Sequence, residues 1–175
     1  SIAPIASCIN RAHKETKFIT VVIENMAASG NVLGSRFEEI ASIIEHVEDK
    51  SRVGVCIDTC KSGYDIRTKE SYKYTSYFSS FVFILISFPL QVNSLKYFCG
   101  MHINGSKTAL TSHRDRHDNM SDGTGNPIIA LGYIISDTRR QNILMILETP
   151  IEDDPGVWQE DTEVHHDLYF ILAAR

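Results

Sequence analysis

The sequence predicts an α/β fold made of consecutive βα units around a parallel sheet, and three observations support this. Four short apolar runs rich in β-branched residues are separated by longer segments, some of which have the spacing of amphipathic helices. The runs begin roughly 35 to 45 residues apart, which is the length of a strand, a crossover helix and two loops. Each run also finishes on or beside an acidic or histidine side chain.

The first two elements are expected to be a helix over residues 3–16 and a strand over residues 18–23, which ends at Glu24. The strand is a nearly continuous apolar run, which is typical of a strand buried on both faces. A glycine-containing loop then leads to an amphipathic helix over residues 35–46, for which Ser35 is the expected N-cap.

The remaining elements follow the same pattern. Helices are expected over residues 126–137 and 157–174, and further strands are expected over residues 52–57, 97–103 and 143–147. The second of these strands contains His102 near its end, whereas the other two are followed by Asp58 and Glu148. Where a helix should cover the sheet, residues 71–94 show aromatic and β-branched side chains without helical spacing, so we treat them as an anomalous insertion or replacement.

Four βα units imply a parallel sheet with all four polar strand ends at one edge. In a (β/α)8 barrel this is the face where catalytic groups converge. Four units make only half of such a barrel, and the sheet would keep two unpaired edges. We therefore predict a partial (β/α)8 TIM barrel of about four βα units, which belongs to a larger domain or must associate.

Composition limits the class of protein but does not identify a partner. The chain has 175 residues, of which 43% are hydrophobic and 22% are charged, enough for one packed core in a single domain or part of one. The formal net charge of -5 argues against a generally basic nucleic-acid-binding protein, although a local basic patch can still meet phosphates. Four irregularly spaced cysteines do not form a secreted disulfide framework, so we expect reduced thiols and an intracellular location.

The termini and the most apolar segment give two further expectations. The N-terminus lacks the charged start and long apolar core of a signal peptide, and the absence of an initial Met indicates residues missing upstream. The apolar stretch of residues 77–92 is shorter than the ~20 residues that a membrane-spanning helix needs. We therefore expect no membrane insertion.

The polar strand ends predict a metal site. Carboxylates and an imidazole suit Zn(II), Mn(II) or a similar divalent ion, and the candidate ligands are Glu24, Asp58, His102 and Glu148. Asp115 and His117 supply a second pair, and Arg116 between them is a candidate phosphate contact, with Arg114, Lys107 and Arg67 extending a basic rim. Neighbouring metal ions generate hydroxide and neutralise a phosphodiester, so phosphoester hydrolysis is the expected reaction.

Each of these residues also has an ordinary structural explanation. A single carboxylate after a strand is most often a helix cap or a hydrogen-bond acceptor, and only its recurrence at all four strand ends favours a site. Cys56 and Cys60 are expected in the core rather than among the ligands. The remaining histidines are expected at the surface, namely His13, His46, His113, His165 and His166.

Several segments of the sequence resemble the endonuclease IV family of apurinic/apyrimidinic endonucleases. They are IENMAASGNVLGSRFEEI, VEDKSRVGVCIDTC, GYDIRT, KYFCGMHIN, RDRH and ILETP. The resemblance implies a (β/α)8 barrel of the xylose isomerase-like type, of which residues 1–175 are similar to the C-terminal half. It also implies a base-excision-repair enzyme that binds up to three zinc ions and cleaves double-stranded DNA on the 5′ side of an abasic site. Such an enzyme is expected in the nucleus or mitochondrion of a eukaryote, or in the cytoplasm of a bacterium.

Residue by residue, the resemblance implies that Glu24 bridges two zinc ions. Asp58, His102 and Glu148 would complete the shell of one of these ions. Glu24 and Glu148 would also be catalytic, with Glu148 helping to activate the attacking water.

The resemblance further implies that Asp115 and His117 hold a third zinc ion and that Arg116 faces the DNA. The family continues the DTC motif with a histidine, whereas this chain has Lys61. One zinc shell is therefore expected to be complete and the others incomplete, and the third ion should be weakened by a missing ligand and a nearby cation.

Two other functions stay open from the residues alone. Sugar isomerases and epimerases on related barrels gather similar ligands around one divalent ion, but the RDRH element and the basic rim favour DNA. The other possibility is a non-catalytic fragment that binds DNA or a partner through the unpaired edges of its sheet.

Overall fold

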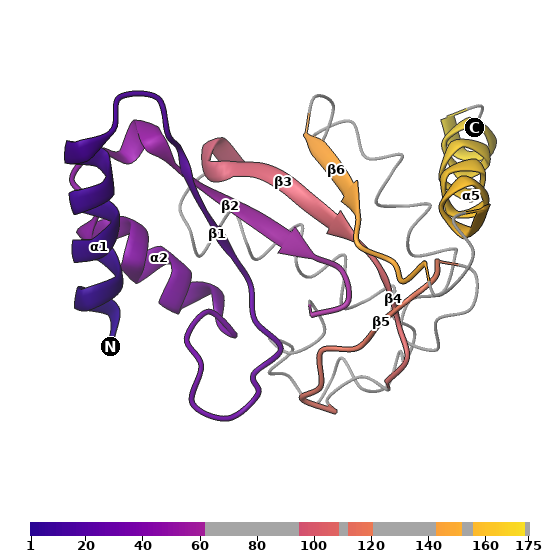
Figure 1. The fold of residues 1–175 in the computed structure, drawn as a ribbon, viewed down its shortest axis with the longest axis horizontal. Helices are drawn as coiled ribbons and strands as arrows, with labels where there is room; N and C mark the ends of the chain where they lie inside the picture. Colours follow the sequence, from indigo (N-terminus) through magenta and orange to yellow (C-terminus); the bar gives the residue numbers. More distant parts are fainter. Residues whose placement is uncertain (62–94, 109–111, 121–142, 152–155, 174–175) are drawn as a thin grey trace.

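The computed structural model describes residues 1–61, 95–108, 112–120, 143–151 and 156–173. Its centre is a parallel sheet in the order β1-β2-β3-β6 (Figure 1). The strands are β1 (Val21–Glu24), β2 (Val53–Asp58), β3 (Phe98–Ile103) and β6 (Leu144–Leu147). All three pairings are parallel, so the predicted partial α/β barrel is confirmed and the carboxyl ends of the strands lie at one edge.

The strand register determines which polar side chains meet at that edge. Asp58, the last residue of β2, lies opposite His102 of β3. Ile103 of β3 lies opposite Leu147, so Glu148 follows directly at the end of β6. On the other side Glu24 pairs with Cys56, two residues before Asp58. Side chains far apart in the sequence are thereby brought to one place.

Two amphipathic helices, α1 (Ile2–Glu15) and α2 (Phe37–His46), lie side by side at the β1 end of the sheet (Figure 1). Both match the predicted helices. The predicted N-cap was wrong by one residue, because Arg36 takes that position and Ser35 lies outside the helix. The Glu39 carboxylate instead accepts the backbone N–H groups of Gly34 at 2.9 Å and Arg36 at 3.3 Å, which stabilises the first turn.

The guanidinium of Arg52 joins the end of α1 to the start of β2. It donates hydrogen bonds of 2.8 Å to the carbonyl oxygens of His13 and Thr16, and it forms a 2.8 Å ion pair with Asp49. Because carbonyls at the end of a helix have no partner within the helix, this contact satisfies groups that would otherwise need water. It also fixes the position of α1 against the sheet.

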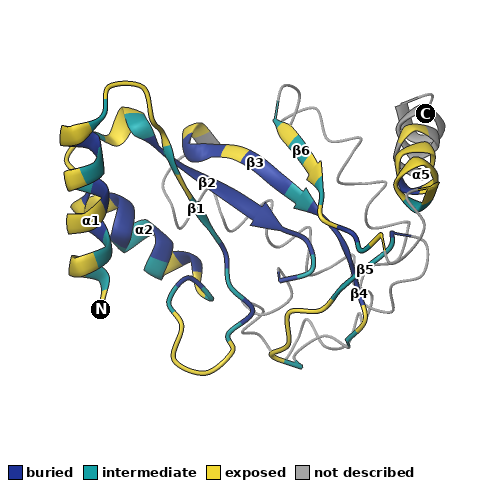
Figure 2. Cartoon of the chain, in the orientation of Figure 1, coloured by how far each residue is buried: buried dark blue, intermediate teal, exposed yellow. Residues whose placement is uncertain are grey.

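Burial differs between the central and outer strands (Figure 2). Every residue of β2 is buried, as expected for a strand covered on both faces. The expectation of full burial was wrong for the first strand, where Phe18 is 95% exposed and Val22 is 45% exposed. β6 is similar, with Leu144 63% exposed, because both strands lie at the edges of the sheet among the described residues.

The core lies between the two helices and the sheet. Its most completely buried side chains include Ile40, Ile43, Ile57, Met101 and Ile103. His13, which was expected at the surface, is only 5% exposed, and neither ring nitrogen has a hydrogen-bond partner among the described residues. It is buried because it lies on the face of α1 that also carries Ala6 and Ile9. The other described histidines that were expected at the surface, His46, His113 and His166, are exposed.

Two short strands were not predicted. β4 (Gly105–Ser106) and β5 (His117–Asp118) form an antiparallel ribbon that follows directly from β3. A Cβ atom on Gly105 would collide with the carbonyl oxygen of Asn119, so only glycine allows this close pairing. The ribbon carries His117 back to the end of the sheet.

The C-terminal helix α5 (Gly156–Ala173) agrees with the predicted helix over residues 157–174. Its Asp161 carboxylate accepts the N–H of Met120 at 2.9 Å, and the Trp158 indole donates to the carbonyl of Thr149 at 2.9 Å. Among the described residues no helix has the length and apolar character to cross a membrane. The anomalous segment 71–94 and the helix expected over residues 126–137 lie outside the described residues.

Candidate metal centre

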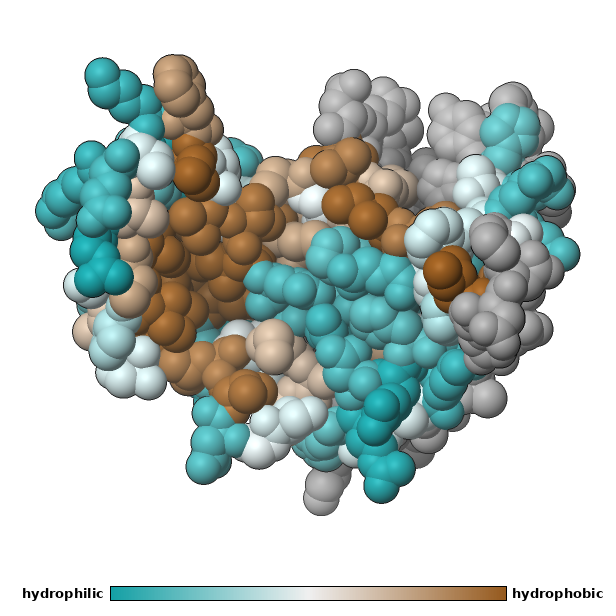
Figure 3. Space-filling view, viewed as in Figure 1, coloured by the Kyte–Doolittle hydropathy of each residue, from teal (hydrophilic) through white to brown (hydrophobic). Residues whose placement is uncertain are grey.

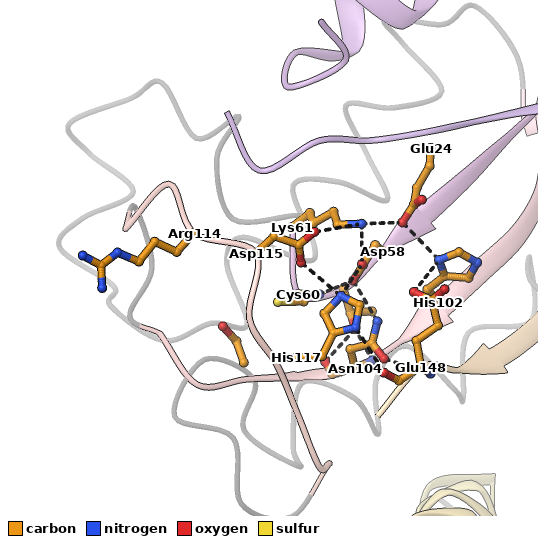
Figure 4. Close-up of polar contacts among 12 residues, drawn as sticks. Glu24, Asp58, Cys60, Lys61, His102, Asn104, Arg114, Asp115, His117 and Glu148 are labelled. Carbon is orange, nitrogen blue, oxygen red and sulfur yellow. Dashed lines mark hydrogen bonds and ion pairs between the residues drawn. The ribbon is translucent and has the colours of Figure 1, made fainter. Parts of the chain in front are cut away.

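Hydrophilic side chains gather over the carboxyl ends of the strands, beside the apolar surface of the sheet (Figure 3). The close-up in Figure 4 shows that acidic, basic and histidine side chains point toward one another from β1, β2, β3 and β5, and from the residues after β2, before β5 and after β6. All six predicted metal ligands take part, together with one residue that was not predicted as a ligand. The acidic cluster, as we call it, consists of Glu24, Asp58, Lys61, His102, Asp115, His117 and Glu148.

Four of the predicted ligands form one compact group. Single ligand atoms of Glu24, Asp58, His102 and Glu148 all lie within 4.8 Å of one another. His102 Nδ1 is 3.0 Å from Glu24 Oε1 and 2.9 Å from Glu148 Oε2. One ring nitrogen carries at most one proton, so it cannot satisfy both carboxylates equally, whereas a shared cation would satisfy all the groups. The donor set and its spacing therefore fit a divalent metal ion.

Asp58 is the centre of the cluster and is completely buried. Its Oδ1 accepts hydrogen bonds from the Cys60 N–H at 2.7 Å and from Asn104 Nδ2 at 3.2 Å. Its Oδ2 lies 3.1 Å from both Lys61 Nζ and His117 Nε2. Burial alone would raise the pKa of Asp58, but the His117 hydrogen bond and the Lys61 charge hold it below its ordinary value. Asp58 is therefore ionised at neutral pH.

Two asparagines that the sequence analysis did not single out position the ends of the strands. The side chain of Asn25 accepts the Asp58 N–H at 2.7 Å and donates to the Asp58 carbonyl at 3.4 Å. Asn104 donates to the Asp58 carboxylate and accepts the Glu148 N–H at 3.0 Å. Both are buried and both follow a predicted strand end, a position that could have indicated them.

His117 forms the second part of the cluster. Its Nε2 lies 3.1 Å from Asp58 Oδ2 and 3.1 Å from Asp115 Oδ1, and its Nδ1 lies 3.1 Å from the Glu148 carbonyl oxygen. The hydrogen bond to Asp58 raises the pKa of His117 to about 9, outweighing the effect of burial. His117 is thus charged at neutral pH, with both ring nitrogens donating.

Cys60 stands next to this second part. Ligand atoms of Asp58, Cys60 and His117 also lie within 4.8 Å of one another, so the structure offers a second group able to hold a metal. The thiol is partly buried, and burial raises its pKa. Cys56 was correctly expected in the core, where burial raises its pKa to about 12.

Lys61 lies inside the cluster rather than at its rim. Its side chain is 8% exposed, and Nζ is 2.8 Å from Glu24 Oε1, 3.1 Å from Asp58 Oδ2 and 3.3 Å from Asp115 Oδ2 (Figure 4). Burial alone would lower the pKa of Lys61, but the hydrogen bond to Glu24 and the charge of Asp58 raise it above its ordinary value. From the sequence we expected only a cation close to a metal site, whereas the structure places Lys61 among three of the predicted ligands.

The predicted DNA contact, Arg116, adjoins the cluster in the chain, whereas the Arg114 side chain points away from it (Figure 4). Arg116, Arg114 and Lys107 are exposed, and the Lys107 N–H donates to the Arg116 carbonyl at 2.9 Å. Arg116 lies between Asp115 and His117, whose side chains both point into the cluster. The remaining rim residue, Arg67, lies outside the described residues.

Comparison with known proteins agrees with the fold. A family model described as a xylose isomerase-like TIM barrel matches residues 1–168. The apurinic-apyrimidinic endonuclease 1 of Schizosaccharomyces pombe is 39% identical over 163 residues, which are 91% of this chain and 44% of that protein. The crystal structure of endonuclease IV from Thermus thermophilus matches with a TM-score of 0.66 and 25% identity, over 87% of this chain and 50% of that chain.

The chain therefore spans about half the length of these two proteins. The family model covers nearly all of it, and the parallel sheet has the architecture that the model describes. The relative and the solved structure both carry endonuclease names. This chain belongs to the xylose isomerase-like TIM barrel family, as an endonuclease IV-like member.

Proposed function

We propose that the protein is a zinc-dependent apurinic/apyrimidinic endonuclease of base excision repair, which hydrolyses the phosphodiester on the 5′ side of an abasic site in double-stranded DNA. The observation that carries the proposal is the convergence of Glu24, Asp58, His102 and Glu148, whose ligand atoms lie within 4.8 Å of one another. The similarity to an apurinic-apyrimidinic endonuclease supports the substrate class. The chain covers 44% of that relative, so the activity of the whole protein is part of the proposal.

The zinc ion would be held by these four side chains. When bound, zinc acts as a Lewis acid toward a phosphoryl oxygen and lowers the pKa of a coordinated water. Carboxylate and imidazole ligands of this kind are common at catalytic zinc sites. Asp58 is suited to be the fixed ligand, because Asn25 holds its backbone and Asn104 its carboxylate.

We assign the role of general base to Glu148. Its side chain is 37% exposed, compared with 30% for Glu24, 18% for His102 and 0% for Asp58, so it is the most accessible of the four to an incoming water. Its carboxylate would accept the proton of the attacking water. The Asn104 side chain positions Glu148 by accepting its N–H. Glu24 would be a ligand of the same metal ion, beside Glu148.

The DNA would approach from the exposed side of the segment that carries Arg116. A protein with a net charge of -5 needs a local source of positive charge to meet the phosphate backbone. Arg116, Arg114 and Lys107 supply one on exposed side chains. A guanidinium suits this role because it can contact a phosphate through two N–H groups. Arg116 would therefore position the strand that is cut.

The test is cleavage of a labelled duplex that contains one abasic site. The full chain loaded with zinc should cut on the 5′ side of that site, and a metal chelator should abolish the cut. Glu148→Gln should lower the rate by roughly a hundredfold or more, in line with removal of a general base. Glu45→Gln is the matched control, because Glu45 is an exposed acid on α2.

Three results would count against the proposal. The first is zinc-loaded, folded chain that leaves the abasic duplex intact, and the second is equal activity of the Glu148→Gln and wild-type proteins. The third is isomerisation of a keto sugar without cleavage of abasic DNA, which would instead support the sugar isomerase interpretation of the same ligands.

A further inference from the structure

The acidic cluster and the neighbouring Cys60 supply two groups of potential metal ligands that share one side chain. Glu24, Asp58, His102 and Glu148 form the first group, and Asp58, Cys60 and His117 form the second, with Asp115 beside His117. Spacing alone would allow an ion in each. Whether both places can be filled depends on which charges already occupy them.

The second place already holds two nitrogen atoms, Nζ of Lys61 and Nε2 of His117. Lys61 Nζ lies 3.1 Å from Asp58 Oδ2 and 3.3 Å from Asp115 Oδ2. His117 Nε2 lies 3.1 Å from the same Asp58 oxygen and 3.1 Å from Asp115 Oδ1. Lys61 and His117 therefore both bridge the same two carboxylates, which are the acidic ligands that a second ion would need.

A metal ion could displace the proton of His117, because neutral imidazole is a common metal ligand. It could not use Lys61 in the same way, since an ammonium group has three donors and no acceptor. The Lys61 side chain is 8% exposed and reaches Nζ into the cluster, with a third carboxylate, Glu24, at 2.8 Å. A divalent ion bound to Asp58 and Asp115 would therefore lie against a fixed positive charge.

Two ligands of the first place, Glu24 and Asp58, also contact Lys61, whereas the other two, His102 and Glu148, contact each other. His102 Nδ1 faces Glu148 Oε2 at 2.9 Å, on the side of the cluster next to β6, and Glu24 Oε1 lies 3.0 Å from the same nitrogen. Glu24 and Asp58 each have a second carboxylate oxygen, so each can in principle touch both Lys61 and a metal ion. Carboxylates then separate the charge of Lys61 from the charge of a metal ion in the first place.

We propose that the ammonium group of Lys61 takes the place of a metal ion at Asp58, Asp115 and His117, so that the chain binds a single divalent ion, at Glu24, Asp58, His102 and Glu148. The count of a single ion rests on the metal site of the proposed function. Lys61 then supplies a permanent positive charge next to the site where a phosphodiester would bind, and this charge does not depend on a metal ion.

Zinc content per folded chain tests the proposal without any activity measurement. Wild-type protein and variants are saturated with zinc and freed of excess metal, and bound zinc is measured by elemental mass spectrometry and isothermal titration calorimetry. Wild type and Lys61→Arg, which keeps the positive charge, should bind one ion per chain. Lys61→His should bind two, because a neutral ligand replaces the cation at the same place.

Two further variants separate charge from coordination. Lys61→Gln removes the charge without adding an imidazole, so it should take up a second ion at least tenfold more weakly than Lys61→His. Lys14→His is the matched control for adding a histidine, because Lys14 is exposed and paired with the exposed acid Glu48. It should bind one ion, like wild type.

The outcomes distinguish this inference from the proposed function. Two zinc ions in the wild type, or one ion in both Lys61→His and Lys61→Gln, would overturn the role of Lys61 and leave the first metal site standing. No zinc in the wild type would overturn both proposals. If the Lys61 variants fail to fold, as judged by circular dichroism, a wild-type count of two ions still overturns the proposal and a count of one ion supports it.

Discussion

The pH dependence of stability gives a direct test of the His117–Asp58 contact. His117 has its pKa raised from 6.5 to about 9 through its hydrogen bond to Asp58. Each tenfold change in proton affinity corresponds to about 1.4 kcal/mol, so protonated His117 stabilises the metal-free folded chain by about 3 kcal/mol. Solvent screening reduces this value little, because the His117 side chain is 23% exposed and Asp58 is fully buried.

The direction of the effect follows from the sign of the pKa change. A folded-state pKa above the unfolded value means that the folded chain binds the proton more tightly. The stabilisation is therefore complete below about pH 6.5, decreases as the pH rises and is lost above about pH 9. His117→Gln removes the titrating group, so its stability should lack this decrease.

The assay is urea unfolding of the full chain with a metal chelator, at several pH values from 6 to 9. The informative quantity is the difference in unfolding free energy between wild type and His117→Gln. The buried thiol of Cys56 and the partly buried thiol of Cys60 also have a raised pKa and lower the stability of both proteins near pH 9 and above, so this subtraction is needed. A difference that stays constant from pH 6 to 9, or that grows with pH, would refute the reasoning.

Three further predictions concern the framework of the site and are checked by urea unfolding. Ile40→Ala, at a core position with 0% exposure, should lower the unfolding free energy by about 2–5 kcal/mol, whereas Ile40→Val should cost about 0.5–1.5 kcal/mol; equal losses would contradict the packing argument. Gly105→Ala should lower the unfolding free energy by about 1–3 kcal/mol and weaken zinc binding, because its Cβ would collide with the carbonyl oxygen of Asn119. If this variant were as stable as the wild type, the β4–β5 pairing would not be tight. Arg52→Lys should lower the unfolding free energy by about 1.5–3 kcal/mol, because a single ammonium cannot replace the guanidinium contacts with the end of α1 and with Asp49. An unchanged midpoint of urea unfolding would show that these contacts do not stabilise the fold.

The sequence was sufficient to predict the repeating elements of this protein. The strand over residues 52–57 was predicted nearly to the residue, because its apolar run is short, β-branched and bounded by polar groups. The same signal overestimated the burial of the run over residues 18–23. Local hydrophobicity does not tell whether a strand lies in the centre of a sheet or at its edge, and β1 lies at an edge among the described residues.

For the site, the sequence alone was enough to predict that Glu24, Asp58, His102 and Glu148 come together, because the polar groups of parallel strands recur at their carboxyl ends. Only the tertiary structure decided how they combine. The β4–β5 ribbon brings His117 to Asp58 across a separation of 59 residues, and the strand register brings Asn104 to both Asp58 and Glu148. The tertiary structure also adds the carboxylates of Glu24 and Asp115 to the local contact between Lys61 and Asp58, so that the ammonium of Lys61 lies among three carboxylates.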